Sequence, residues 1–511
     1  MTIAHSPLFE PVLWRGEGFK ILNELVLPEA VQYLEIKDVS EALDAVKQMK
    51  TRAFGQVLTF IYSGVLVAKD YQGRDAEPLR RELAEMTQAF SEARPTFDFA
   101  GLGAEMSGWL AQLPEGESPG VGIAKQALAF ARRIVEARQA RAQRAAVVLP
   151  HRACVLTHCN VSGELVAVAQ YGKALGKDLA FIATETRPYL QGTRLTAWEL
   201  AQAGIKVSLI PDSGIAQVMA KGEVHAVIVG ADRTAQNGDV INKVGTYPLA
   251  LMAREYGIPF HALVQDPRSL ARGGDVAIEE RPAAELLNFQ GQRLLSDSGS
   301  SVKVRYPAFD VTPSHLVTTL IAFDGSYTPD SFRQKFEKFP GPDAARFEGG
   351  KRYLLVFGIP RKNDYKYLAD RLETEGAESI LLPEMRPELW GARVVARELL
   401  HRKIPLTLIA DNTMGTLIAR EEVRRLYLFS KGISESEPRG ACGSLMVLRL
   451  ARAHGVPVEL LESATAREAA LDDNVATFLG QRIIPPGVTV YPVENEIIPP
   501  VLLNEIQGVS S

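Results

Sequence analysis

Two residues of this chain, Cys159 and Asp232, combine reactive side chains with positions where active sites form. Cys159 follows a strand-like run, Cys154–Thr157, and precedes a helical stretch that begins near Gly163. Asp232 follows another strand-like run, Ala226–Val229. Ligands of open α/β sheets bind at the carboxyl ends of strands, and a thiol near a helix N-terminus favours its thiolate. A thiolate and a carboxyl group at neighbouring strand ends can act as base and acid on one small molecule.

Each of these residues also fits a structural role. A lone cysteine is often core packing, which we expect for Cys154 inside its strand, and an aspartate after a strand often caps a helix or turn. His158 beside Cys159 suggests a metal or a dyad, but adjacent strand residues face opposite sides of a sheet. No Cys-x-x-Cys or His-x-x-x-His spacing occurs. We therefore expect no metal at this site.

A polar segment follows Asp232 and could bind an anion. Asn237-Gly238-Asp239 is a turn signal, and Asn242 and Lys243 follow it, where we expect a helix to begin. Backbone N–H groups at a helix start, together with a lysine, suit a phosphate. No Gly-x-Gly-x-x-Gly follows a strand and no Walker A motif occurs, so a dinucleotide is not indicated and we expect no cofactor.

The region that carries these residues alternates between strand-like and helical segments. The strand-like runs are Cys154–Thr157, Leu179–Ala183, Lys206–Ile210, Ala226–Val229 and Pro259–Val264, and the helical stretches are Leu195–Ala203, Ile215–Lys221 and Tyr247–Tyr256. The helices end in Gly204, Gly222 and Gly257, where a left-handed C-cap is expected. Buried parallel strands that alternate with helices predict a doubly wound, Rossmann-like α/β domain over residues 149–326.

The preceding residues, 1–148, predict a different kind of domain. Residues 12–27 contain two short strand-like runs around a Gly-Glu-Gly turn. From about residue 39 to 145 the apolar residues follow the helical period with almost no strand signal. We expect a mostly helical N-terminal domain with a small β-hairpin.

The last part of the chain repeats the α/β region. Arg187-Pro188 returns as Arg386-Pro387, an offset of 199 residues, and several other motifs return at offsets of 185 to 199 residues. These are Leu209-Ile210-Pro211-Asp212 with Leu408-Ile409-Ala410-Asp411, Ala253-Arg254-Glu255-Tyr256-Gly257 with Ala451-Arg452-Ala453-His454-Gly455, Gly291-Gln292-Arg293 with Gly480-Gln481-Arg482, and Tyr306-Pro307 with Tyr491-Pro492. Self-similarity of this length predicts a second Rossmann-like domain over residues 351–511, after a polar linker at 327–350.

The repeat lacks the reactive residues. Cys159 aligns with Gly358, and Asp232 aligns with Lys431 or Gly432. We therefore expect residues 351–511 to be a degenerate, non-catalytic repeat, with regulatory ligand binding as the alternative.

Composition and charge exclude several other classes of function. The 511 residues carry a net charge of -4, so no basic excess indicates a nucleic-acid or membrane partner. Three cysteines favour a reducing compartment without a disulfide framework. No signal peptide and no apolar run of about 18 residues is visible. We expect a cytoplasmic protein.

Several motifs between about residues 10 and 325 resemble the methylthioribose-1-phosphate isomerase family. They are Thr157-His158-Cys159-Asn160, Glu185-Thr186-Arg187-Pro188, Leu190-Gln191-Gly192-Thr193-Arg194, Val227-Ile228-Val229-Gly230-Ala231-Asp232-Arg233, Asn237-Gly238-Asp239, Asn242-Lys243 and Pro307-Ala308-Phe309-Asp310. This family belongs with ribose-1,5-bisphosphate isomerases and the regulatory α, β and δ subunits of translation initiation factor 2B. The resemblance implies conversion of an aldose 1-phosphate, most closely 5-methylthioribose 1-phosphate, to methylthioribulose 1-phosphate in methionine salvage, a route of amino-acid biosynthesis.

The resemblance also implies roles for individual residues. Cys159 and Asp232 would be the catalytic pair. The residues that would hold the sugar and its phosphate are Gln191, Asn242, Lys243, Arg52 and Arg94. Where the family usually reads Arg-Gly-Ala-Pro, this chain has Arg52-Ala53-Phe54-Gly55. The substrate is therefore open between methylthioribose 1-phosphate and a sibling such as ribose 1,5-bisphosphate or 5-deoxyribose 1-phosphate.

Two further alternatives follow from the family. Its initiation-factor members lack the Cys/Asp pair, so a non-enzymatic sensor or scaffold is the alternative from another class. For an enzyme, either Asp232 protonates the ring oxygen while Cys159 moves the C2 proton to C1 through an enol, or a hydride shifts directly. The family's catalytic domains are expected to pair as dimers. We expect residues 351–511 to take the partner's place in an internal pseudo-dimer, with a homo-oligomer of the whole chain as a further option.

Overall fold

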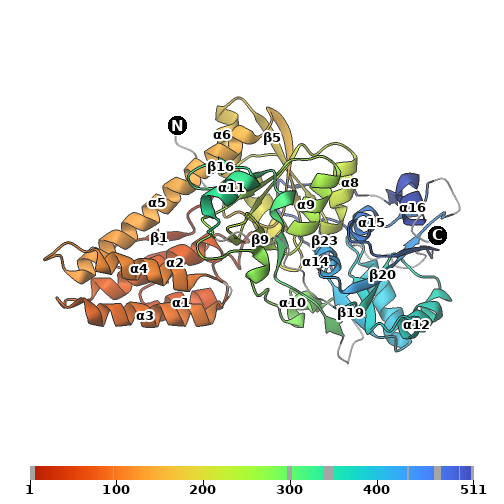
Figure 1. Cartoon of the computed structure of the whole chain (residues 1–511), viewed down its shortest axis with the longest axis horizontal. Helices are drawn as coiled ribbons and strands as arrows, with labels where there is room; N and C mark the ends of the chain where they lie inside the picture. Colours follow the sequence, from red (N-terminus) through yellow and green to blue (C-terminus); the bar gives the residue numbers. More distant parts are fainter. Residues whose placement is uncertain are drawn as a thin grey trace. The chain divides into compact units, whose positions relative to one another are not determined.

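The computed structural model describes residues 6–95, 97–295, 302–338, 350–433, 437–464, 473–493 and 495–507. The chain divides into two compact units, whose elements are labelled in Figure 1. The first unit comprises Met1–Leu149, Val161–Gly176 and Ala322–Gly325, and the second comprises Pro150–Asn160, Lys177–Ile321 and Ser326–Ser511.

The first unit is mostly helical, with a small antiparallel sheet. Its elements are β1 (Val12–Trp14), β2 (Phe19–Leu22), β3 (Tyr33–Ile36), α1 (Val39–Lys47), α2 (Phe54–Lys69), α3 (Ala76–Ala93), α4 (Phe99–Ala111), α5 (Pro119–Val148) and α6 (Glu164–Ala174). The two strands predicted around Gly-Glu-Gly are present as β1 and β2, and β3 was not predicted. Among the described residues, no helix is long and apolar enough to cross a bilayer.

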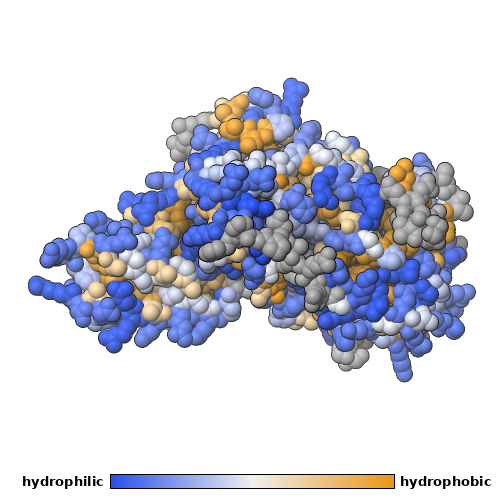
Figure 2. Space-filling view, viewed as in Figure 1, coloured by the Kyte–Doolittle hydropathy of each residue, from blue (hydrophilic) through white to orange (hydrophobic). Residues whose placement is uncertain are grey.

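Helix α3 illustrates how the sequence shapes this unit. It buries Leu79, Leu83, Met86 and Phe90, which recur at helical spacing and so form one apolar stripe. The Phe90 ring packs edge-on against Phe60 of α2, with ring centroids 5.3 Å apart. Hydrophilic side chains dominate the outward side of this helix (Figure 2). The apolar period therefore determines which face enters the core of the unit.

The second unit contains an eight-stranded sheet in the order β16-β15-β10-β7-β4-β5-β6-β25. Its strands are β4 (Arg152–Thr157), β5 (Asp178–Thr184), β6 (Val207–Ile210), β7 (Ala226–Gly230), β10 (Phe260–Leu263), β15 (Thr319–Ile321), β16 (Ser326–Tyr327) and β25 (Thr489–Val490). The five predicted strands are confirmed, and all but β16 run parallel to their neighbours. The glycines after the predicted helices, Gly204, Gly222 and Gly257, have φ of 69°, 72° and 66°.

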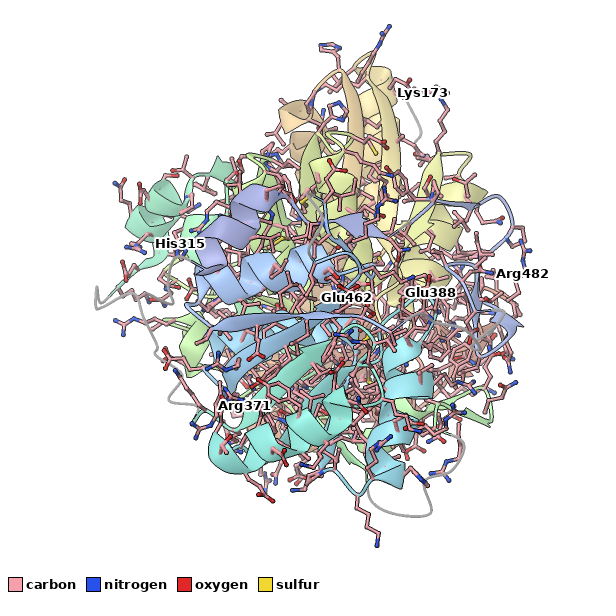
Figure 3. The ribbon with its side chains drawn as sticks, turned by 90° about the vertical axis from the view of Figure 1, so that its right-hand side faces the viewer. Lys173, His315, Arg371, Glu388, Glu462 and Arg482 are labelled. Carbon is pink, nitrogen blue, oxygen red and sulfur yellow. The ribbon has the colours of Figure 1, made fainter. Side chains whose placement is uncertain are left out.

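A six-stranded parallel sheet in the order β13-β19-β18-β17-β20-β22 lies in the same unit. Its strands are β13 (Lys303–Val304), β17 (Tyr353–Phe357), β18 (Ser379–Pro383), β19 (Leu406–Ile409), β20 (Val423–Ser430) and β22 (Val458–Glu462). Figure 3 shows this sheet, in teal and blue, apart from the yellow strands of the eight-stranded sheet. The protein therefore has a mixed α/β fold with two largely parallel sheets and many helices.

Each sheet takes an edge strand from the sequence region of the other. β13 precedes the linker predicted at 327–350, yet Val304 pairs with Leu408 of β19, which follows that linker. β25 lies near the C-terminus, yet Thr489 pairs with Ser208 of β6. The exchange joins the two sheets by backbone hydrogen bonds in both directions.

Helices of both sequence regions pack on one another between the sheets. The helices of this unit are α7 (Trp198–Gln202), α8 (Ile215–Ala220), α9 (Thr246–Glu255), α10 (Ala283–Leu287), α11 (Pro329–Phe336), α12 (Asp364–Thr374), α13 (Ala396–His401), α14 (Met414–Ala419), α15 (Ser444–Ala453) and α16 (Pro500–Gln507). α9 contacts α14 and α15, and α8 contacts α15 (Figure 1). Within the predicted linker 327–350, α11 is present and residues 339–349 lie outside the described part.

Short π-helices and 3-10 helices follow the strands at equivalent places. The π-helices are η1 (Gly192–Ala197) and η5 (Gly391–Val395), and the 3-10 turns that concern the site are η2 (Asp212–Gly214) and η6 (Asp411–Thr413). A Cβ at Gly192 would come within 1.7 Å of the Thr184 carbonyl oxygen, so only glycine permits η1 to approach β5 this closely. The predicted helix over Leu195–Ala203 is therefore a π-helix that continues as α7.

Small antiparallel sheets correct one prediction about the site. They are β8 (Arg233–Thr234) with β9 (Val240–Lys243) and β14 (Phe309–Thr312), β11 (Asn288–Phe289) with β12 (Gln292–Arg293), β21 (Arg439–Gly440) with β26 (Glu496–Ile497), and β23 (Thr477–Phe478) with β24 (Gln481–Arg482). Asn242 and Lys243 lie in β9, not at a helix start, because β14 pairs with this segment and the left-handed Gly245 delays α9 until Thr246.

Two buried ion pairs connect the loops that follow β5 and β18. Arg187 donates to both carboxylate oxygens of Glu384 at 2.8 Å, and Arg386 donates to those of Glu185 at 2.8 and 3.0 Å. All four side chains are at most 1% exposed. Phe478 lies under both guanidinium groups, 4.1 and 5.1 Å from its ring centroid. The pairs are reciprocal, since each loop supplies one arginine and one glutamate.

Removing one charge of such a pair should be costly. We expect Glu384→Gln to lower the free energy of unfolding by about 3–5 kcal/mol, because it leaves the buried Arg187 charge uncompensated. Urea-induced unfolding of the wild type and the variant measures this loss of free energy. Asp370→Asn in the exposed Lys366–Asp370 pair is the control and should change it by less than about 1 kcal/mol. Equal effects of the two substitutions would contradict the importance of the buried pair.

Candidate active site

Cys159 and Asp232 follow two adjacent parallel strands. β4 and β7 are neighbours in the eight-stranded sheet, with Leu156 opposite Val227. Cys159 and Asp232 both come after the carboxyl ends of these strands, and both residues are half-buried, so solvent or a ligand can reach them. The structure therefore places the two residues of the predicted catalytic pair at the same edge of one sheet.

The backbone of Cys159 is held in a left-handed conformation. Its φ is 64°, which a residue other than glycine rarely adopts and which costs about 1–2 kcal/mol. Its N–H donates to Thr186 Oγ1 at 2.9 Å, and its carbonyl accepts from Thr196 Oγ1 at 2.6 Å. Gly358, at the offset of 199, has a φ of 90°. A strained cysteine fixed by two hydroxyl groups is typical of a functional residue.

Asn160 extends this network. Its Nδ2 donates to Thr196 Oγ1 and to Glu199 Oε1, both at 2.9 Å. Thr196 thus accepts from Asn160 and donates to the residue before it, Cys159. The turn after β4 is therefore attached to η1 and α7 by side-chain hydrogen bonds on both of its residues.

His158 connects the end of β4 to β5 and to the segment after β9. Its Nε2 lies 2.9 Å from the Val244 carbonyl, which can only accept, so Nε2 carries the proton. Nδ1 then accepts from Thr184 Oγ1 at 2.7 Å. Burial, with Lys243 nearby, lowers the pKa of His158 to about 4, so the ring is neutral and its 3.9 Å approach to Asp212 is not an ion pair. Because β4 ends at Thr157, strand alternation does not decide where His158 points, and its ring nitrogens are both occupied by Thr184 and Val244.

The backbone of Asp232 lies beside β9. Its N–H donates to the Ile241 carbonyl at 2.9 Å, and its own carbonyl accepts from Gln265 Nε2 at 2.7 Å. Asn242 and Lys243 follow Ile241 directly and are both buried. Asp232 is thus hydrogen-bonded to the residue that precedes Asn242 and Lys243.

Gln191 lies just before η1 and has an unsatisfied polar atom. Its side chain is 4% exposed, and Oε1 has no hydrogen-bond partner within the described residues. A buried amide oxygen without a partner is costly, and a donor from a ligand would satisfy it. Gln191 is therefore suited to accept a hydrogen bond from a sugar hydroxyl.

Arg52 and Arg94 lie in the first unit, close to a single turn. Arg94 Nη1 contacts Met49 Sδ, and the Arg52 N–H donates to Glu24 Oε1 at 2.9 Å. Burial raises the pKa of Glu24 to about 7. Ala53 has φ 41° and ψ −112°, a conformation that suits the glycine usual at this place. That the two arginines join the Cys159 site stays a prediction.

Sequence reasoning missed the residues that hold Cys159, namely Asn160, Thr186 and Thr196. The repeat contains a signal that could have found them. At the offset of 199, these polar residues are replaced by apolar ones, Ile359, Met385 and Val395. Polar positions that become apolar when the cysteine is lost mark groups that serve the cysteine.

Comparison with known proteins gives a consistent picture. The profile of the initiation factor 2 subunit family matches residues 57–329. A methylthioribose-1-phosphate isomerase of Desulforudis audaxviator is 38% identical over 339 residues, which are 63% of this chain and 94% of that protein. A 5-deoxyribose 1-phosphate isomerase of Moorella thermoacetica is 38% identical over 344 residues, 64% of this chain and 96% of that protein.

A solved structure agrees with these relatives. The 5-methylthioribose 1-phosphate isomerase of Pyrococcus horikoshii superimposes with a TM-score of 0.57 at 32% identity. It covers 66% of this chain and 99% of its own. About a third of this chain therefore lies outside each of these matches.

The neutral His158 should make the protein acid-labile. Its folded pKa of about 4 lies below the unfolded value of about 6.5, so this group stabilises the fold above pH 6.5 and loses that contribution as the pH falls to 4. We expect His158→Phe, which introduces the residue found at Phe357, to destabilise the protein at pH 8. The difference from the wild type should shrink by up to about 1.4 kcal/mol per pH unit between 6.5 and 4. Urea unfolding of both proteins at several pH values measures this difference in unfolding free energy. A difference that does not change with pH would contradict a neutral, buried His158.

Proposed function

This chain belongs to the initiation factor 2 subunit family, and we propose that it is an aldose–ketose isomerase that converts 5-methylthioribose 1-phosphate to methylthioribulose 1-phosphate. The observation that carries the proposal is Cys159, held in a left-handed conformation at the strand end next to that of Asp232. The identity to named isomerases supports it. The predicted cytoplasmic location and the place in methionine salvage belong to the same proposal.

We assign the chemistry to the residues of the site. Because phosphate blocks the anomeric oxygen of an aldose 1-phosphate, the ring needs acid assistance to open. Asp232 protonates the ring oxygen as its bond to C1 breaks, and the Cys159 thiolate carries the C2 proton to C1 through an enol. The proton of the C2 hydroxyl returns to Asp232 as the ketone forms. Gln191 accepts from a sugar hydroxyl, while Asn242 and Lys243 bind the sugar and its phosphate.

Two phosphate contacts of this proposal come from the first unit. Arg52 and Arg94 contribute positive charge, and guanidinium groups bind phosphate oxygens in a fixed, often bidentate geometry. Arg94 contacts Met49, which lies three residues before Arg52, and this supports a joint role.

A sibling substrate is the second candidate. The 5-deoxyribose 1-phosphate isomerase of Moorella thermoacetica is as similar, at 38% identity, as the methylthioribose-1-phosphate isomerase named above. Ala53 and Phe54 replace the usual Gly-Ala beside the proposed phosphate contacts. Measuring kcat/KM for a panel of 5-methylthioribose 1-phosphate, 5-deoxyribose 1-phosphate and ribose 1,5-bisphosphate therefore identifies which group at C5 of the sugar the enzyme prefers.

We propose four segments, with residues 351–511 as a degenerate Rossmann-like repeat of residues 149–326. Residues 1–148 form the helical domain and 327–350 the linker. The exchange of edge strands, the reciprocal ion pairs and the paired π-helices support the repeat. It lacks the chemistry, since Cys159 aligns with Gly358 and Asp232 with Lys431 or Gly432. The repeat thus takes the place of a partner subunit in an internal pseudo-dimer with one active site.

The activity test is direct. We expect the purified protein to convert 5-methylthioribose 1-phosphate to the ketose, and Cys159→Ser to lower kcat by about 10²–10⁴-fold because the base is lost. Cys154→Ser is the control, since burial raises the pKa of this strand thiol to about 11 and it has no assigned role. No turnover of any aldose 1-phosphate in the panel would favour the alternative from another class, a non-enzymatic sensor or scaffold.

Isotope retention distinguishes the enol from the hydride shift. With deuterium at C2 of the substrate, we expect loss of label to solvent during turnover, because a thiol exchanges its proton with water. Mass spectrometry of the ketose measures the label. Full retention at C1 in every turnover would establish the hydride shift instead, with Cys159 and Asp232 only polarising oxygens.

A further inference from the structure

We propose that the non-catalytic sequence region supplies a positioning residue, Asn412, that fixes the Cys159 turn through Asp212 and Thr186. Asn412 lies in η6 and is 1% exposed. This inference rests on the proposed function, since it assigns a role for the second region in the chemistry of Cys159. It goes further, because it makes the site incomplete without residues 351–511.

The first step is the contact made by Asn412. Its Nδ2 donates to the Arg187 carbonyl at 3.0 Å and to Asp212 Oδ2 at 2.9 Å. Both partners can accept, and only a group with two N–H donors satisfies both at once. The amide of Asn412 therefore fits the space between η2 and the loop after β5.

The second step leads from Asp212 to the cysteine. Asp212 Oδ1 accepts from the Thr186 N–H and Oδ2 from the Arg187 N–H, both at 2.8 Å. Thr186 Oγ1 in turn accepts from the Cys159 N–H at 2.9 Å. Thr186 is itself left-handed, with φ 60°. Asn412 therefore hydrogen-bonds to Asp212, and Asp212 hydrogen-bonds to the left-handed Thr186. The hydroxyl of Thr186 in turn accepts from the left-handed Cys159.

Asn412 also lies beside the turn that follows the proposed phosphate contact. A Cβ at Gly245 would come within 2.9 Å of the Asn412 Cβ and within 2.8 Å of His158 Nε2. Gly245 is therefore required for this close approach. Since Lys243 lies two residues before Gly245, Asn412 contacts the surroundings of both the cysteine and the lysine.

The position that corresponds to Asn412 in residues 149–326 is occupied by a serine. Ser213, at the offset of 199 before Asn412, donates to the Arg386 carbonyl at 3.0 Å and lies 3.6 Å from Cys442 Sγ. A hydroxyl has one proton and cannot donate to two acceptors. Asp411 accepts from Met385 and Arg386 N–H groups, as Asp212 does on its side. The two-donor residue therefore occurs on the side that faces the reactive cysteine.

The test removes one or both donors of Asn412. Asn412→Ser keeps a single donor, as in Ser213, and Asn412→Asp keeps the shape while removing the amide. We expect kcat to fall about tenfold or more with KM within twofold, because misplacing the cysteine by about 1 Å can cost 10²-fold. Ser213→Ala is the control, because Ser213 is equally buried and its hydroxyl donates to a carbonyl of residues 351–511, that of Arg386. It should leave kcat within twofold even where it lowers stability.

A second readout needs no substrate. The rate of Cys159 alkylation by iodoacetamide, followed by peptide mass spectrometry between pH 6 and 10, reports on the thiol directly. We expect Asn412→Ser to change this rate at least threefold or displace its pH profile, and Ser213→Ala to leave both unchanged. If the protein turns over no aldose phosphate, the proposed function fails, but alkylation still decides the role of Asn412.

A double substitution tests the chain of contacts. Thr186→Val removes the acceptor for the Cys159 N–H, whereas Thr186→Ser retains it and should restore most of the wild-type alkylation profile. Adding Asn412→Ser to Thr186→Val should cause little further loss, since both act through the same hydrogen bonds. The proposal is overturned if folded Asn412 variants keep kcat within twofold with an unchanged alkylation profile, or if the double variant loses the product of both single effects.

Discussion

The reciprocal pairing of Arg187 with Glu384 and of Arg386 with Glu185 is the constraint on which the second unit depends. Four charged side chains are removed from water here, and each is paired with an opposite charge about 200 positions away in sequence. Such pairs are costly to desolvate and are tolerated when geometry and further hydrogen bonds are complete. The two sheets can therefore join in one register only, since a shift would leave buried charges unpaired.

The same loops determine the conformation of the candidate active site. Arg187 follows Thr186, so its pairing with Glu384 also positions the hydroxyl that accepts from Cys159. Asp212 stabilises that loop through two backbone N–H groups, although burial and the neighbouring Glu185 raise its pKa to about 7. The left-handed Cys159 is maintained by this surrounding network, because its own backbone preference opposes it.

The two regions of the second unit share a scaffold and differ in chemistry. Gly358 adopts the left-handed conformation without strain, where Cys159 requires two threonine hydroxyls. Where the reactive residue is absent, the supporting hydroxyls are absent as well, at Met385 and Val395. This difference supports the proposal of one active site and one non-catalytic region.

The sequence by itself determined the α/β class, the five central strands, the left-handed glycines after the helices and the candidates Cys159 and Asp232. These depend on local apolar period, on turn residues and on recognisable motifs. It misplaced Asn242 and Lys243, because a strand that pairs with a distant segment carries little local signal. The exchanged edge strands, the buried ion pairs and the contacts of Asn412 were decided only by tertiary structure, since each joins residues that no local pattern relates.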